Sequence, residues 1–306
     1  MVLVFAASDK GGTGRSVTSC NMAYWASMCG RKVAYLDFDF GSPTAGTIFE
    51  IGKFDRGVSD GSGLHRYLSG GSLDVQRVGI HVTTDRRELK QSCRSPGSLV
   101  LLPGDRGGGE FISGITESMV ARCAELFAVC DRDFDLSFID LSAGRSAALT
   151  LAVRAIKHPL LADNVFRWLV FHRWTRQHIA ATYGLVHGEH GILHLGRDCG
   201  FERGELRGSM RFVRTAVPEL GTQVLRSAQS AWLQTQLIAL DRSAIRYGMG
   251  RSVLLGKTPV EPILQCREQV ILDEDVAKGV ANLETVNAFR ELVQRLCDEA
   301  EWEGVE

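Results

Sequence analysis

One stretch constrains the fold of this chain more than any other: Ser8-Asp9-Lys10-Gly11-Gly12-Thr13-Gly14-Arg15-Ser16. An apolar run at 2–7 leads into it, and a helix-permissive run at 17–28 follows it. In the order strand, glycine-rich turn and helix, backbone N–H groups can surround an anion without Cβ clashes, and the helix N-terminus adds about half a positive charge. Ser16 lies where a loop hydroxyl would hold Mg²⁺. The stretch therefore predicts a phosphate-binding loop.

Acidic residues end two further apolar strands. The strand at 32–40 ends in Asp37 and Asp39, whose alternate positions place both on one side. The strand that begins at Asp135 ends in Asp140 and breaks at Gly144. Strand-end aspartates also start ordinary turns. Ligands bind at the carboxyl ends of parallel strands, however, so these acids predict a ligand site beside the phosphate loop, and Asp140 is placed where a buried strand presents a carboxylate to the water shell of Mg²⁺.

The motifs resemble those of the ParA/MinD family of P-loop ATPases. Lys10, Gly11, Gly12, Gly14 and Ser16 match the family's deviant Walker A motif, and Arg15 departs from it, because the family has lysine there. The runs 35–43, 98–104 and 135–144 look like the family's second motif, its Leu-x-Leu-Leu-Pro strand and its Walker B strand. The resemblance keeps the family's order up to about residue 150 and thins to general layout beyond it.

The resemblance implies an α/β fold of the P-loop NTPase type. This is a three-layer sandwich with a mostly parallel central sheet and helices on both faces. We expect residues 1–306 to form a single domain, with a loop-rich insertion at about 41–97 and a diverged half at about 160–306. The insertion contains one helical pattern, 63–69. A third strand follows at 98–104.

The resemblance also implies a site for ATP and Mg²⁺ in a homodimer. Lys10 would reach the phosphates of the partner subunit, and Asp39 would orient the attacking water, so these two would be catalytic. Asp37 and Asp140, with Ser16, would arrange the metal. The implied nucleotide-binding residues are Gly11, Gly12, Thr13, Gly14, Arg15, Ser16, Val17 and Gly144, the last through its N–H to the γ-phosphate.

Arg15 leaves the reaction open. A guanidinium is a rigid charged fork that binds phosphate, but the loop's radius suits the smaller ammonium of lysine. Positioning is nearly all that a protein contributes to phosphoryl transfer, so binding is better supported than hydrolysis. The sequence favours a slow ATPase acting as a nucleotide-dependent dimer switch. The alternative is a pseudo-ATPase scaffold that binds a protein partner without turnover. A kinase or synthetase would need an acceptor pocket in 41–98 or 160–260, and none is recognisable.

The composition excludes some partners. The net charge is −1, so no global basic field indicates nucleic acid. Arg167, Arg173 and Arg176 alternate with tryptophans, and we expect the aromatic rings in the core and the arginines at the polar end of their strand. The tail at 298–306 is acidic, which disfavours a membrane surface. Eight cysteines without a C-x-x-C pair fit a reducing cytoplasm.

Periodicity predicts most of the elements beyond about residue 115. We expect helices at 116–130, 147–156, 230–247 and 283–297, and strands at 164–171 and 210–218. The helix at 230–247 is predicted to bury Leu233, Leu237, Ile238 and Leu240. The segment 188–208 is predicted to be irregular, and 260–266 resembles the family's late strand and loop. Base-binding residues are not assigned, and His172, His178, His187, His190 and His194 are predicted to be core or solvent residues rather than ligands.

Overall fold

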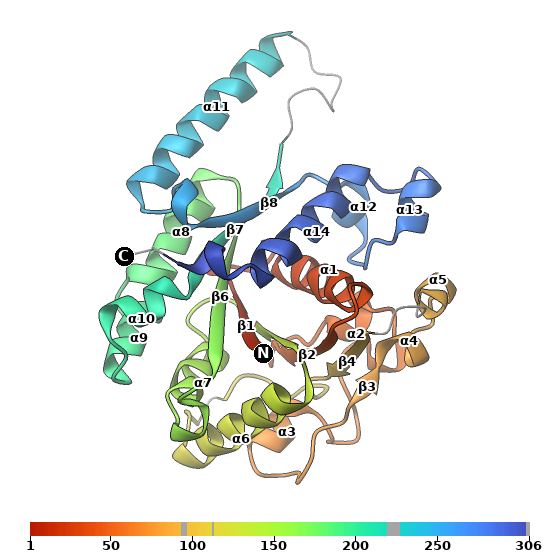
Figure 1. Ribbon diagram of the computed structural model, residues 1–306, viewed down its shortest axis with the longest axis vertical. Coiled ribbons are helices and arrows are strands. Elements are labelled where there is room, and N and C mark those ends of the chain that lie inside the picture. The colour runs from red at the N-terminus through yellow and green to blue at the C-terminus, as the bar shows by residue number, and fades with distance from the viewer. Residues whose placement is uncertain (93–96, 112, 219–226, 304–306) are drawn as a thin grey trace.

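The computed structural model describes residues 1–92, 97–111, 113–218 and 227–303 and contains an eight-stranded sheet (Figure 1). The strands lie in the order β3-β4-β2-β5-β1-β6-β7-β8. Every neighbouring pair is parallel except β3 and β4. The strand bounds are β1 Val2–Ala7, β2 Lys32–Phe38, β3 Val78–Gly79, β4 Ser98–Leu102, β5 Leu136–Leu141, β6 Val165–Arg173, β7 Met210–Val217 and β8 Leu254–Pro259. The predicted mostly parallel α/β fold is confirmed.

Both faces of the sheet are buried, which explains why its strands read as continuous apolar runs. Alternate β1 residues belong to different cores: Val4 packs with α1 (Arg15–Met28) and α14 (Leu283–Cys297). Phe5 packs on the opposite face with α6 (Glu117–Asp133) and α7 (Ala147–Ile156). Figure 1 shows these two pairs of helices on either side of the strands. The predicted three-layer arrangement is therefore confirmed.

The connections contain more regular structure than the sequence indicated. The segment 188–208, predicted to be irregular, contains two short helices, α9 and α10. The strand and loop expected at 260–266 were placed too late, because β8 ends at Pro259 and a helix begins at Pro262. A proline at the first helical position loses no hydrogen bond, which favours a helix start there. The remaining helices are α2 Ala45–Ile48, α3 Leu64–Leu68, α4 Ile80–Thr83, α5 Arg87–Gln91, α8 Arg176–His187, α9 Ile192–Asp198, α10 Arg203–Gly208, α11 Ser227–Arg246, α12 Pro262–Cys266 and α13 Asp273–Ala277, with 3-10 turns at Gly52–Phe54, Pro159–Leu161, Arg251–Val253 and Glu299–Trp302.

Helix α11 projects away from the sheet at the top of Figure 1. The predicted helix is present, but its predicted inward face is only partly correct. Leu240 is buried, whereas Ile238 is 48% exposed. Trp232, near the start of the helix, is 64% exposed. The helix packs mainly against α8, which leaves most of its apolar side chains with little to cover them. No helix within the described ranges has the length and apolarity that a membrane crossing requires.

Arg167 is buried, which contradicts the prediction that it lies at the polar end of its strand. Its guanidinium donates to the Leu296 carbonyl and pairs with Glu299 at 2.6 Å. The Trp302 ring lies 4.7 Å from Arg167 and 4.8 Å from Arg211, so two cations contact one aromatic ring. The acidic tail therefore packs against the sheet as far as it is described; residues 304–306 lie outside that range.

Candidate functional site

The ends of three neighbouring strands bring the sequence motifs together. The register pairs Asp37 of β2 with Asp140 of β5, and it pairs Ala6 of β1 with the same Asp140. The loop that follows β1 therefore begins beside both carboxylates, at the carboxyl edge of the sheet. Sequence reasoning placed these residues at one edge, and the structure brings them together there.

The loop takes a shape that requires glycine at two positions. Gly12 and Gly14 have φ angles of 70° and 76°, in the left-handed region that side chains disfavour. Gly14 is the N-cap of α1, so the positive end of that helix faces the loop. The Thr215 hydroxyl on β7 donates to the Thr13 carbonyl and ties the loop to the second half of the chain. This geometry is suited to an anion.

The Arg15 side chain points inward, and it is only 6% exposed. Its Nε donates to Asp140 Oδ1 at 2.5 Å, and its Nη2 donates to Asp39 Oδ2 at 3.0 Å. Nη2 also donates to Ser16 Oγ at 3.2 Å, and Nη1 reaches Ser8 Oγ at 3.4 Å. The guanidinium therefore bridges the predicted Walker B acid, the predicted water-orienting acid and the predicted metal hydroxyl.

The charges in this cluster support one another. Burial alone would lower the pKa of Arg15, but Asp140 and Asp39 outweigh it, and the pKa is raised above its ordinary value. Burial raises the pKa of Asp39, and the nearby Arg15 charge acts against that rise. The guanidinium is thus a permanent cation at the centre of the site, and the carboxylates around it depend on that charge.

Asp140 has a second hydrogen-bond donor besides Arg15. The Tyr35 hydroxyl donates to Asp140 Oδ2 at 2.9 Å and lies 2.8 Å from the Ser19 hydroxyl. Burial, and then the Asp140 charge, raise the pKa of Tyr35 well above its ordinary value. The tyrosine therefore keeps its proton and remains a donor. Both oxygens of Asp140 are occupied by protein groups.

Asp37 is buried, and its carboxylate accepts hydrogen bonds from backbone N–H groups. Its Oδ2 accepts from the Ala45 N–H at 3.0 Å, and its Oδ1 accepts from the Asp39 N–H at 3.3 Å. Burial, followed by the charge of Asp140, raises its pKa well above the ordinary value. Asp37 holds the turn between β2 and α2 in place, and Arg15 bonds to Asp39 and Asp140 instead.

The remaining predicted residues line the same edge. The Gly144 N–H, predicted to meet a γ-phosphate, donates here to the Ser8 carbonyl at 2.7 Å, and Gly144 has a φ of 77°. Lys10 lines the loop cavity, and the neighbouring Asp9 pairs with Arg145 at 3.5 Å. The contacts of Gly144 and Lys10 with phosphate stay predictions.

Two adjoining cavities lie over the loop. One, of about 150 Å³, is lined by the loop itself, Asp39 and Ala143. The other, of about 170 Å³, lies against the ends of β7 and β8. Both include Gly12 to Gly14, Val17 and Glu268, so they adjoin along the loop, and the two together are called the trough below. The second cavity supplies candidate base-binding residues that the sequence did not reveal: Arg173, Thr215, Ala216, Thr258, Pro259, Leu264 and Gln265.

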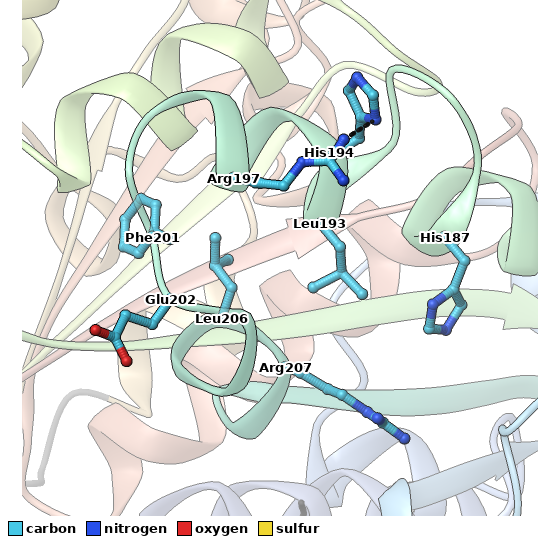
Figure 2. Close-up of a pocket in the computed structure, with 8 residues that line it drawn as sticks. All are labelled: His187, Leu193, His194, Arg197, Phe201, Glu202, Leu206 and Arg207. Atoms are coloured by element: carbon cyan, nitrogen blue, oxygen red, sulfur yellow. Dashed lines mark hydrogen bonds between the residues drawn. The ribbon is translucent and has the colours of Figure 1, made fainter.

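A larger pocket, of about 530 Å³, lies elsewhere, on α8, α9 and α10 (Figure 2). His187, His194, Arg197 and Arg207 line it together with apolar side chains, and Arg197 donates to His194 Nδ1 at 2.9 Å. It shares no lining residue with the trough. Size alone therefore does not identify the site, and the chemistry of the loop argues for the smaller cavities.

The predicted Mg²⁺ ligands do not fit a metal as they are arranged here. Mg²⁺ requires oxygen ligands in near-octahedral geometry, with several positions left for water. Ser16 Oγ and Asp140 Oδ1 contact the Arg15 guanidinium instead, and Asp37 is engaged by backbone N–H groups. Within the described residues, no three His, Cys, Asp or Glu side chains are grouped to hold a metal ion.

Known proteins place the chain in a family. No curated protein matches its sequence. Three solved structures match its fold at 14% identity: a Cyanothece McdA variant in complex with ATP, MinD from Pyrococcus horikoshii with Mg-ADP, and the Aquifex aeolicus MinC:MinD complex. The McdA match has a TM-score of 0.63 and covers 97% of this chain and 96% of that chain. The P. horikoshii MinD match has a TM-score of 0.55 and covers 98% of each chain. The A. aeolicus match has a TM-score of 0.60 and covers 100% of this chain and 97% of that chain. Residues 4–170, more than half of the chain, match the model of the CobQ/CobB/MinD/ParA nucleotide binding domain, and the chain belongs to that family.

Proposed function

We propose that this chain binds ATP in the trough and acts as a nucleotide-dependent dimer switch, with residues 1–306 working as a single domain. The observation that carries the proposal is that the two cavities adjoin and share the lining of the phosphate loop. One end of the trough is a loop of backbone N–H groups at a helix N-terminus, which suits phosphate. The other end lies between strand ends, with mixed polar and apolar lining, which suits a base and its ribose.

The similar structures support the choice of ligand. The McdA variant was solved with ATP and the P. horikoshii protein with Mg-ADP, and their chains align with nearly all of this one. The A. aeolicus MinD was solved with a second protein, MinC. By analogy, we infer that the nucleotide-bound dimer of this chain presents a surface to a protein partner.

The proposed dimer is supported by Lys10, which matches the early lysine of the family's deviant Walker A motif. Its side chain lines the loop cavity, and no ion pair of Lys10 is found in the part of the chain that the structure describes. By analogy with the family, this lysine would reach the phosphates of the partner subunit. We expect a non-hydrolysable ATP analogue to convert the wild type from monomer to dimer in sedimentation velocity, and Lys10→Ala to stay monomeric. Lys90→Ala, at an exposed lysine on α5, is the matched control and dimerises like the wild type.

One observation favours nucleotide binding without turnover, the second candidate. Asp39 would have to orient the attacking water, yet its carboxylate is paired with Arg15 at 3.0 Å. While that ion pair persists, Oδ2 of Asp39 is engaged by Arg15, and only its other lone pairs face water. Phosphate release from ATP, measured with and without a cell extract as the source of a partner, tests this candidate. Release at the buffer rate throughout supports the scaffold, and release above it supports an ATPase.

A further inference from the structure

Arg15 occupies the position that the sequence assigns to a divalent cation. The guanidinium has five N–H donors, and four contacts are accounted for, on Ser8, Ser16, Asp39 and Asp140. Two of these four acceptors, the Ser16 hydroxyl and the Asp140 carboxylate, are predicted metal ligands. One N–H of Nη1 is left over, and it could donate a hydrogen bond to a phosphate oxygen.

The acids around Arg15 are already committed. Tyr35 takes the other oxygen of Asp140, and Asp37 accepts from two backbone N–H groups. A metal would have to share these carboxylate oxygens with the donors that already occupy them. Asp140 is 1% exposed and Arg15 is 6% exposed, so the metal would enter a dry environment, where an added charge is costly.

A divalent ion and this guanidinium also exclude each other electrostatically. Arg15 Nε lies 2.5 Å from an oxygen of Asp140, the acid that the sequence predicts to face the water shell of the ion, so the two cations would lie close together. Like charges at that separation repel strongly in a buried site. Arginine does not lose its proton, so the repulsion cannot be relieved by titration. A lysine has a single compact charge that can withdraw along a flexible stem.

We propose that the Arg15 guanidinium is the built-in counter-cation of this site, replacing Mg²⁺, so that the chain takes up its phosphate ligand without a divalent ion. This inference rests on the proposed nucleotide binding. The phosphate then meets the loop N–H groups, the N-terminus of α1, Lys10 and the remaining Arg15 N–H. Asp39 and Asp140 neutralise the guanidinium rather than hold a metal.

The test measures cation binding directly. Mn²⁺ is titrated into the full chain with and without a non-hydrolysable ATP analogue, and bound ion is counted by electron paramagnetic resonance. We expect no tightly bound Mn²⁺ in the wild type and about one per chain in Arg15→Lys, which frees Ser16 and Asp140. Arg145→Lys is the matched control, because Arg145 contacts Asp9 and the Gly184 carbonyl and lies outside the acid cluster. It should bind as little Mn²⁺ as the wild type.

Nucleotide affinity is measured in parallel with excess Mg²⁺ or with a chelator. The wild-type affinity should change by less than about threefold, whereas that of Arg15→Lys should fall at least about tenfold without Mg²⁺, as expected when one strong charge contact is lost.

One Mn²⁺ bound by the wild type and lost in Asp140→Asn overturns the inference, even if Arg15→Lys does not fold. So does the absence of Mn²⁺ from a folded Arg15→Lys, since the acids then form no latent metal site. Nucleotide binding that requires Mg²⁺ in the wild type overturns the inference and leaves the proposed function standing. Absence of nucleotide binding under every condition removes the proposed function, while the Mn²⁺ counts still decide what Arg15 replaces.

Discussion

Acid should destabilise this protein through His172, a residue at the end of β6, the strand beside the phosphate-loop strand. The imidazole is fully buried next to Trp174 and Phe212. Its Nδ1 donates to the Arg173 carbonyl at 3.2 Å, so Nε2 carries the lone pair, and Nε2 has no partner within the described residues. A proton placed on Nε2 would create a buried cation without an acceptor.

The pKa of His172 shows this cost. Burial, and then the nearby positive charges of Arg214 and His178, lower it from 6.5 to about 4, although the Arg173 carbonyl acts in the opposite direction. Between these two values the unfolded chain binds a proton that the folded chain does not, so stability falls as the pH falls from 6.5 towards 4. The loss is about 2 kcal/mol at pH 5 and about 3 kcal/mol once both states are protonated.

His172→Phe separates this contribution from those of other acidic and basic groups. The phenyl ring fills a similar volume and removes the unpaired Nε2, at the expense of one hydrogen bond. Urea unfolding, followed by circular dichroism at pH 7.5 and pH 5.0, should show that the wild type loses about 2 kcal/mol more than the variant over this interval. His190→Asn, at an exposed position with a φ of 61°, should lose as much as the wild type. Equal losses for wild type and His172→Phe would refute the reasoning.

Three further changes have effects that follow from geometry. Arg15→Met leaves Asp39 and Asp140 without their cation and should lower the free energy of unfolding by about 3–5 kcal/mol in urea titrations at pH 7.5. Gly46→Ala places a Cβ 1.9 Å from the Phe54 carbonyl oxygen, so the free energy of unfolding should fall by about 1–3 kcal/mol. Calorimetry should show a lower melting temperature, whereas glycine to alanine at an open position should not lower it in this way. Trp302→Ala removes the ring that covers Arg167, so the free energy of unfolding in urea should fall by about 2 kcal/mol. An unchanged value would mean that the tail contributes nothing to stability.

The sequence predicted the site where local patterns determine position. The loop lies between a strand and a helix, and Asp37, Asp39 and Asp140 end apolar strands, so their common edge follows from parallel pairing alone. The glycines of the loop were expected to avoid Cβ clashes around an anion, and Gly12 and Gly14 take positive φ angles there. Each of these inferences needs only the residues adjacent in the chain and the rule that ligands gather at the carboxyl edge.

The cavity beside β7 and β8 could not be predicted in this way. Thr215 contacts the Thr13 carbonyl across 202 positions of sequence, and Thr258 comes from a third segment. Only the packing of the second half against the first brings these residues to the loop, and no periodicity records that packing. The burial of Arg167 was missed for the same reason, since its partners lie on the last helix and the tail.

The direction in which Arg15 points also depends on tertiary structure, and it has two consequences for this protein. A guanidinium in the loop could turn outward to solvent and phosphate, or inward to the acids. Burial favours the inward arrangement only because Asp39 and Asp140 are both present to pair with it. The acids in turn would lose their paired cation without Arg15. Arginine and carboxylates therefore depend on each other, so a change at Arg15 alters stability and ligand binding together. This mutual dependence gives the acids a role beside Arg15 with or without ATP hydrolysis.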